Sequence, residues 1–421
     1  MTTNSSASDP SAAQSSDSSA ALPAEQPSTP LLSALLGENT ALAVLEDRKP
    51  TVTQQTQAAY NALYSATHPL PAGLLHTLAA VVAVQHGSRA LLTWHLGQVD
   101  DRALFDDLIA GTTPADPLLA ALVDFVDTVS VSPALAQAPD QDALATAGAD
   151  PDLVVLIGQL VAFESYLIRL VAGLTALDPT AVADRDLLPL PALARTPHSR
   201  GREGERSALT VTGRSRPTAF TREFLDWEPW VPAPAEDELT EEQIESFASK
   251  ASTGNVYFRL ISRTPGVTLA RSTLDNAVFT SKEGLDKGER ELAAAVSSKV
   301  NDCVYCASVH ARKAEQRTHR AEDVDRMLAI DLTRDADWVA SDVEALAAGQ
   351  DERWTVLIET AARLAALVPQ FDEADAGRLR ALGLAELEIV DHVASTAFFG
   401  WANRLMLTLG EPHWPDTQDA A

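Results

Sequence analysis

The sequence predicts an all-α protein made of two tandem copies of one helical domain, the first of them degenerate. In most of the chain, apolar residues recur at the three- and four-residue spacing of an amphipathic helix. The chain has 421 residues, of which 46% are hydrophobic, and this length is typical of two or three domains with real cores. A third observation is self-similarity, because a helical stretch of the first half aligns with one of the second half without a gap.

The N-terminal segment, residues 1–30, is rich in Ser, Ala, Pro and Asp and has almost no large apolar side chains. Such a composition cannot offset the entropy of ordering the chain, so we expect a disordered tail. Helical spacing begins near residue 31 and continues to 184, in stretches such as PAGLLHTLAAVVAV and DLVVLIGQLVAFESYLIRLVAGL. These stretches predict that residues 31–184 form the first, degenerate helical domain.

The composition changes in residues 185–239, where a basic, Gly/Ser/Thr-rich stretch is followed by a Trp/Pro-rich one. We expect a flexible linker that ends in a docked segment, because Trp227 and Trp230 are too apolar to remain in water. Helical spacing returns in GERELAAAVSSKV, DCVYCASVHARKAEQ and LAELEIVDHVASTAFFGWANRLMLTLG. Residues 240–412 are therefore predicted to form the second helical domain, with a short tail at 413–421.

The charge and the cysteine content exclude several classes of protein. With 59 acidic and 32 basic residues, the net charge of −27 would repel nucleic acids and anionic membranes. No window approaches 18 uninterrupted apolar residues, and the N-terminus lacks the basic and apolar regions of a secretory signal. Two cysteines cannot form a disulfide framework. We expect a cytoplasmic protein that has neither a nucleic acid nor a membrane as its partner.

The internal repeat consists of two blocks with different offsets. Residues 61–95 align with residues 276–310, so that His95 corresponds to His310. The second block contains LVAFESYLIRL and TAFFGWANRLM, and it pairs Phe163 with Phe398, Tyr166 with Trp401 and Arg169 with Arg404. The difference between the offsets predicts an insertion of about twenty residues after His310, in the region DLTRDADWVASDVEALAAGQ.

The two copies differ at the positions that could carry chemistry. The first half has His76, Ser88 and Leu91 at the positions of Glu291, Cys303 and Cys306. The first copy therefore lacks both thiols and the acid. We expect it to be a structural partner or a pocket without redox chemistry, with His95 as a core or hydrogen-bonding histidine.

Four residues of the second half form the candidate site. Eleven residues separate Glu291 from Cys303, two separate Cys303 from Cys306, and three separate Cys306 from His310. Cys306 follows Cys303 at i+3 and His310 follows Cys306 at i+4, so the three side chains project from one helix face. The two sulfurs are then close enough to form a disulfide, with an imidazole beside the second sulfur. A histidine is the usual proton acceptor near neutral pH.

Cys303 is predicted to lie in the first turn of a new helix. Asn301 and Asp302 interrupt the preceding helix, and Asp302 is a natural N-cap. Free backbone N–H groups and the positive end of the helix dipole stabilise a thiolate at such a position.

Thiol chemistry indicates what such a site can do. A Cys306 thiolate attacks the terminal oxygen of a hydroperoxide, which gives an alcohol and a sulfenic acid, and Cys303 then resolves the sulfenic acid as a disulfide. Glu291 could accept and return protons through His310 or a bridging water. This chemistry needs no cofactor and no metal.

Two other interpretations of the same residues stay open. Cys303, Cys306, His310 and Glu291 could hold zinc, or the two cysteines could be a buried structural pair. A c-type haem would need a histidine where Ala307 stands, and thioredoxin-type chemistry would need a strand before the helix.

At these residues the sequence resembles the alkylhydroperoxidase D-like branch of the carboxymuconolactone decarboxylase superfamily. The hallmark of this branch is Glu, eleven residues, Cys, two residues, Cys, three residues, His, and Glu291, Cys303, Cys306 and His310 fit it at every spacing. The resemblance covers residues 240–412, and the first half looks like the degenerate copy found in fused two-domain members.

The resemblance implies an all-α fold and a peroxidase that uses no haem, flavin or metal. It also implies that Cys306 is the peroxidatic thiol and that the reductant attacks the more exposed sulfur, Cys303. In the best-characterised branch a lipoyl-bearing protein is the reductant, and a further histidine lies between the cysteines, where this chain has Tyr305. By analogy we expect a homo-oligomer, with a trimer favoured.

Taken together, these patterns predict a thiol-dependent peroxidase that reduces organic hydroperoxides in antioxidant defence, with a dithiol or lipoyl-type protein as reductant. Phe398, Phe399 and Trp401 either line its pocket or belong to the ordinary core. One alternative is a non-enzymatic redox-sensing or scaffold protein with a CxxC switch. The other is the decarboxylation or lactone chemistry of the thiol-free branch, with His95 in the first half as its support.

Overall fold

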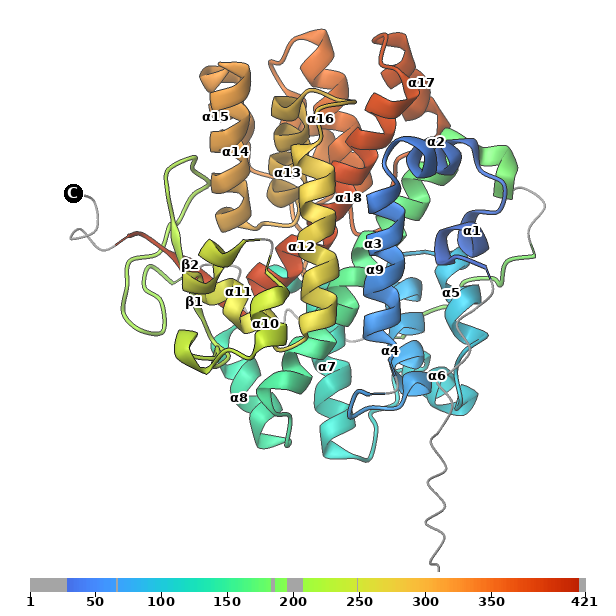
Figure 1. Cartoon of the computed structure of the whole chain (residues 1–421), viewed down its shortest axis with the longest axis vertical. Coiled ribbons are helices and arrows are strands. Elements are labelled where there is room, and N and C mark those ends of the chain that lie inside the picture. The colour runs from blue at the N-terminus through green and yellow to red at the C-terminus, as the bar shows by residue number, and fades with distance from the viewer. Residues whose placement is uncertain (1–28, 66, 183–185, 195–206, 248, 416–421) are drawn as a thin grey trace, which may run out of the picture.

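The computed structural model describes residues 29–65, 67–182, 186–194, 207–247 and 249–415. In this part of the chain, 18 α-helices, five short 3-10 helices and two strands are formed (Figure 1). The fold is mostly helical, as the sequence predicts. Most of the two predicted tails and part of the predicted linker lie outside the described residues.

The prediction that the chain is all-α throughout is wrong at one place. Strands β1 (Asp226–Pro229) and β2 (Gly410–His413) pair antiparallel in a two-stranded sheet. Both strands contain proline, which sequence patterns disfavour in strands. The pairing places the segment before the second half against the chain that follows its last helix.

The first half contains nine α-helices and two 3-10 helices of the described chain. They are α1 (Leu31–Leu36), α2 (Thr40–Arg48), α3 (Pro50–Leu63), α4 (Ala72–Gln85), α5 (Arg89–Leu96), α6 (Arg102–Ile109), α7 (Pro117–Val131), η1 (Pro133–Leu135), α8 (Ala138–Thr146), α9 (Pro151–Leu177) and η2 (Pro179–Val182).

The second half contains the other nine α-helices and three 3-10 helices. They are η3 (Glu236–Glu238), α10 (Glu241–Glu245), η4 (Lys250–Gly254), α11 (Val256–Ile261), α12 (Pro265–Thr280), α13 (Lys287–Val300), α14 (Val304–Thr318), α15 (Ala321–Ala329), η5 (Val343–Ala347), α16 (Glu352–Ala365), α17 (Glu373–Ala381) and α18 (Glu386–Thr408).

Helices α9 and α18 pack against each other at the centre of the molecule (Figure 1). Helix α9 begins with Pro151 after the N-cap Asp150, whose carboxylate accepts the Leu153 N–H at 2.8 Å. By length and composition α9 could cross a membrane, but its most apolar window is completely buried in the fold, as expected for a core helix. At Gly400 of α18 an added Cβ would lie 2.9 Å from the Ser165 carbonyl oxygen, so glycine permits this close crossing.

The helices recur along the chain at the offsets of the sequence repeat. Helices α12, α13 and α14 begin 215 residues after α3, α4 and α5, at 265 against 50, 287 against 72 and 304 against 89. Helices α16, α17 and α18 begin 235 residues after α7, α8 and α9, at 352 against 117, 373 against 138 and 386 against 151. The additional residues of the second half lie in the longer helix α14 and mainly in the connection between α15 and α16.

Two buried arginines join the halves reciprocally. Arg169 of α9 donates from Nη2 to the carbonyl oxygens of Ala365 (3.1 Å) and Ala366 (2.8 Å), at the end of α16. Arg404 of α18 donates from Nη2 to the carbonyl oxygen of Ser130 (2.9 Å), near the end of α7. Because α7 and α16 are equivalent in the repeat, each arginine binds the same place in the opposite half.

The docked segment packs on the second half through Trp227. Its side chain is buried, its Nε1 donates to the Met406 carbonyl oxygen at 3.1 Å, and its ring meets Tyr257 edge-on at 5.6 Å. The Trp230 backbone N–H donates to the Leu409 carbonyl oxygen at 2.8 Å. The sheet and these contacts cover the side of α18 next to α11.

Candidate active site

The helical hairpin of α13 and α14 carries all four residues of the predicted constellation. Glu291 lies in the first half of α13, and Cys303, Cys306 and His310 follow one another at the start of α14. Glu291 and Cys303 are each 1% exposed and Cys306 is 5% exposed, while the His310 side chain is 14% exposed. The site is therefore almost closed to solvent, with the imidazole as its most accessible group.

The turn between the two helices differs from the prediction. Asp302 is not the N-cap of α14; it has a φ of 61°, and its carboxylate accepts the Trp338 Nε1–H at 2.7 Å. Cys303 is the N-cap, and its backbone N–H donates to the Ser298 carbonyl oxygen at 2.8 Å. Asp302 has a left-handed backbone instead of the extended one of an N-cap, and its side chain makes a tertiary contact.

Both cysteines are free thiols, and their environment differs from the one that the resemblance implies. Cys303 is less exposed than Cys306, whereas the reductant was expected to reach a more exposed Cys303. Burial raises the pKa of the Cys306 thiol well above its ordinary value, and the hydrogen bond with Cys303 raises it further. Cys306 is thus a protonated thiol near neutral pH, and a nucleophilic role would need a base.

Glu291 and His310 form the closest contact of the site. His310 Nδ1 lies 2.6 Å from Glu291 Oε2, and Arg317 Nη2 lies 3.5 Å from Glu291 Oε1. Burial alone would raise the pKa of Glu291, but the hydrogen bond and charge of His310, with Lys313 and Arg317, lower it below the ordinary value. An ionised Glu291 accepts the proton on Nδ1, which leaves His310 Nε2 as a proton acceptor.

Phenylalanines surround this imidazole. Phe399 meets His310 edge-on at 4.4 Å, and Phe279 lies 5.8 Å from His310 and from Phe399. Phe398 is 5.8 Å from Phe399. These aromatic rings make the surroundings of the imidazole apolar.

Trp401, the third aromatic residue expected either to line the pocket or to belong to the core, faces the first half. Its Nε1 donates to Gln159 Oε1 at 2.7 Å, and its ring meets Phe163 edge-on at 5.2 Å. Trp401 is completely buried, so it belongs to the core between α9 and α18.

Tyr305 lies between the two cysteines in the sequence, at the place where the resembling branch has a further histidine. Burial raises the pKa of Tyr305 to about 12, and Cys306 adds to this rise. The phenol therefore keeps its proton at neutral pH and cannot replace a histidine as a base.

Three residues near the thiols were missed by the sequence reasoning: Arg271 and Asp275 of α12, and Tyr257 of α11. Arg271 lies over the rings of Tyr257 (5.7 Å) and Phe398 (5.2 Å), and its charge acts to lower the pKa of Cys306. Burial raises the pKa of the Asp275 carboxyl, which the charges of Arg271 and His310 oppose. The only sequence signal is an Arg and an Asp four residues apart, which is typical of a surface ion pair.

The first half has a polar cluster at the equivalent place, without sulfur. His76 Nδ1 lies 3.0 Å from His95 Nδ1, and His95 Nε2 lies 3.1 Å from Glu164 Oε2. Tyr64 donates to Glu164 Oε1 at 2.8 Å and stacks on His76 at 4.0 Å. Burial, together with His95, lowers the pKa of His76 to about 3, so this imidazole is neutral. Ser88 is the N-cap of α5, as Cys303 is of α14.

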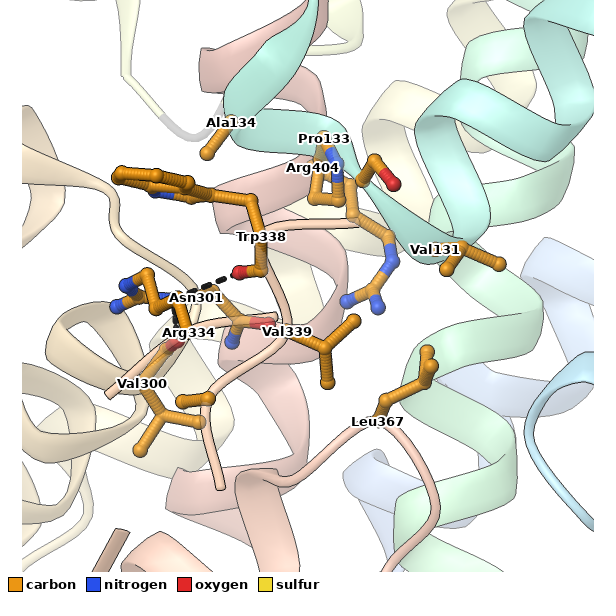
Figure 2. Close-up of a pocket in the computed structure, with 12 residues that line it drawn as sticks. Val131, Pro133, Ala134, Val300, Asn301, Arg334, Trp338, Val339, Leu367 and Arg404 are labelled. Atoms are coloured by element: carbon orange, nitrogen blue, oxygen red, sulfur yellow. Dashed lines mark hydrogen bonds between the residues drawn. The ribbon is translucent and has the colours of Figure 1, made fainter. Parts of the chain in front are cut away.

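The end of α13 is closed by the connection between α15 and α16 (Figure 2). Arg334 Nη1 donates to the carbonyl oxygens of Val300 and Trp338, each at 3.0 Å. A cavity of only about 30 Å³ remains between these residues and Arg404. At the equivalent end of α4, where the chain has no such insertion, a cavity of about 430 Å³ opens around His86 and Val368. The insertion thus packs against the turn that holds Cys303.

The structure brings Glu291 and His310 into contact and places both cysteines at the start of the same helix. In the described part of the chain, no group of three or more His, Cys, Asp or Glu side chains is arranged to hold a metal ion. The fold and the site together define a helical dithiol protein with a carboxylate-oriented histidine.

A comparison with protein families identifies a domain that contains this site. Residues 265–351 match the Carboxymuconolactone decarboxylase family. The match runs from the first residue of α12 to the residue before α16, so it contains Glu291, Cys303, Cys306 and His310. The second half of the chain therefore contains a domain of the carboxymuconolactone decarboxylase family, which includes alkylhydroperoxidase D-like peroxidases. No curated protein matches the chain significantly.

Proposed function

We propose that the protein is a thiol peroxidase that reduces organic hydroperoxides by means of Cys306 and Cys303. The observation that carries the proposal is the pairing of Glu291 with His310, at 2.6 Å, on the same helix as two free thiols. A buried thiol with a raised pKa needs a proton acceptor before it can attack. His310 Nε2, four residues after Cys306, is the acceptor that Glu291 orients.

In the first step, the Cys306 thiol gives its proton to His310, and the thiolate attacks the terminal oxygen of the hydroperoxide. An S–O bond forms and the O–O bond breaks, so that the sulfur is oxidised to a sulfenic acid and the peroxide is reduced. The leaving alkoxide takes the proton from His310 and departs as an alcohol.

In the second step, the Cys303 thiol attacks the sulfenic sulfur of Cys306. An S–S bond forms, and the sulfenic hydroxyl leaves with the Cys303 proton as water. A dithiol, such as a lipoyl-type protein, then reduces the disulfide. Because Cys306 is the more exposed sulfur in this structure, access of the reductant to Cys303 would need a local opening at the start of α14.

We also propose that the first half is a degenerate second copy of the same domain. The repeated helix starts and the reciprocal contacts of Arg169 and Arg404 support this. The paired His76 and His95 take the positions of Glu291 and His310. This copy has no thiol at the start of its helix α5, so it would hold the second copy in place without redox chemistry.

The competing function is a redox switch that changes packing on oxidation without turnover. The burial of both sulfurs favours this candidate, because a buried disulfide is slow to exchange with an outside thiol. Steady-state turnover distinguishes the two functions. With cumene hydroperoxide and dihydrolipoamide in excess, we expect each protein molecule to reduce many equivalents of peroxide, and Cys306→Ser to reduce none. One equivalent consumed per protein, followed by arrest, would favour the switch.

A further inference from the structure

Arg271 occupies an unusual environment in helix α12. It is 4% exposed, and within the described residues it makes no ion pair. Its guanidinium lies over two aromatic rings, with the guanidinium carbon 5.7 Å from the centre of Tyr257 and 5.2 Å from that of Phe398. The side chain is therefore held between aromatic rings, and its charge acts on the Asp275 carboxyl without an ion pair.

Two nitrogens of this guanidinium, Nε and Nη1, have no hydrogen-bond partner among the residues that the structure describes. The hydroxyl of Tyr257, a residue that is 7% exposed, is likewise without a partner there. A buried donor without a partner loses its hydrogen bond to water without compensation, and the cost is larger for a charged group. Three such donors side by side mark a place where a polar ligand would satisfy them.

This place belongs to the thiol site. Phe398, over which Arg271 lies, is part of the aromatic cluster that reaches His310 through Phe399. The positive charge of Arg271 acts on Cys306 and favours its thiolate. The donors therefore lie beside the aromatic cluster of the thiol site and not on a distant surface.

We propose that the guanidinium of Arg271 and the hydroxyl of Tyr257 bind the two peroxide oxygens of the hydroperoxide and direct its terminal oxygen at Cys306. The inference rests on the proposed peroxidase function and names two catalytic residues for it. The apolar part of the hydroperoxide would then pack against the phenylalanines near His310, so the site selects an organic hydroperoxide with an apolar substituent.

The chemistry of the first step explains why such donors are needed. While the S–O bond forms and the O–O bond breaks, negative charge moves from the Cys306 sulfur to the leaving oxygen. Fixed donors in a site with little water stabilise charge that develops in the transition state. Arg271 also stabilises the thiolate from which the charge starts, whereas Tyr257 acts on the peroxide alone.

The test uses stopped-flow measurement of one turnover with cumene hydroperoxide in the full chain. Arg271→Met should slow peroxide reduction about 100-fold, the effect typical of removing one oxyanion donor, and Arg271→Lys should restore part of the rate. Tyr257→Phe keeps the ring and removes only the hydroxyl, so it should fold normally and lose about tenfold. Arg312→Leu removes a half-buried positive charge from α14 and should react at the wild-type rate.

A second readout separates a role in the reaction from a merely structural role. In a Cys303→Ser background, the alkylation of Cys306 by iodoacetamide reports the thiolate without any peroxide. Arg271→Met should shift the pH profile of alkylation upward, and Tyr257→Phe should leave it unchanged.

The outcomes distinguish this inference from the function on which it rests. If the wild-type protein reduces peroxide and Tyr257→Phe and Arg271→Met do so at the same rate, the inference is wrong while the peroxidase function stands. If the wild-type protein itself leaves the peroxide intact, both are wrong.

Discussion

His310 Nδ1 lies 2.6 Å from Glu291 Oε2, with the His310 side chain 14% exposed and that of Glu291 2% exposed. The buried carboxylate fixes the proton of the imidazole on Nδ1, so that Nε2 is the atom that can take a proton. A base with one defined tautomer is what a thiol with a raised pKa requires.

The first prediction concerns the Glu291–His310 pair in catalysis. Glu291→Gln removes the charge that favours the acceptor form of Nε2, so the rate of peroxide reduction at pH 7 should fall about 100-fold, the range found for general acid–base groups. The measurement is the single-turnover rate with cumene hydroperoxide. His76→Asn changes the equivalent position of the first half and is the matched control, with an unchanged rate; equal rates in both variants would contradict the role of Glu291.

The second prediction is a pH dependence of stability. The folded-state pKa of Glu291 lies below its ordinary value of 4.5, so its contribution is complete above pH 4.5 and is lost as the pH falls through the lowered pKa. At pH 7, Glu291→Gln should lower the free energy of unfolding by roughly 1–3 kcal/mol, as for a hydrogen bond to a charged group. Urea unfolding should show that the difference from wild type shrinks as the pH falls below 4.5. A difference that is constant from pH 7 to pH 3 would show that the carboxylate is not stabilised in the fold.

The third prediction compares two reactions of the same sulfur. Because burial raises the pKa of Cys306 above its ordinary value of 9.0, alkylation by iodoacetamide in Cys303→Ser should still increase above pH 9. Peroxide reduction uses His310 as a base and should already be fast at pH 7. Parallel pH profiles for the two reactions would mean that a free thiolate, and not assisted deprotonation, determines both.

The fourth prediction concerns the contact between the halves. Arg404→Met leaves the Ser130 carbonyl oxygen without its donor at 2.9 Å, and Arg169→Met does the same to Ala366 at 2.8 Å. Each variant should lose about 2 kcal/mol of the free energy of unfolding, the cost of an unsatisfied buried group. Arg89→Met removes an arginine that donates to two exposed carbonyl oxygens, those of Leu187 and Leu188, and should lose much less. If all three variants lost the same free energy of unfolding, the reciprocal contacts would stabilise the fold no more than an exposed hydrogen bond does.

Much of the site could be predicted from the sequence, because helical spacing is local geometry. Cys303, Cys306 and His310 follow one another at i+3 and i+4, so a helix places them on one side without any tertiary information. The repeat predicted that His310 and His95 are equivalent. His310 is paired with Glu291, and His95 is paired with His76, which has the position of Glu291 in the first half. Patterns that depend on the helix period or on an internal repeat can be recognised in the sequence alone.

The parts that the sequence did not predict depend on contacts between distant segments. Asp302 is a good N-cap by type, but Trp338, 36 residues later, uses its carboxylate. Arg271 has the spacing of a surface ion pair with Asp275, and only the packing of α12 against α18 buries it over Phe398. The order of exposure of the two sulfurs likewise follows from tertiary packing.

A thiol count after one turnover shows directly whether Cys306 and Cys303 reduce a hydroperoxide. The protein is reduced, freed of reductant and metal, given one equivalent of cumene hydroperoxide, and titrated for free thiols in wild type, Cys303→Ser and Cys306→Ser. We expect wild type to lose both thiols with matching consumption of peroxide, Cys303→Ser to react once and stop at the sulfenic acid, and Cys306→Ser to be inert. Survival of both wild-type thiols in the presence of peroxide would show that the protein is not a thiol peroxidase.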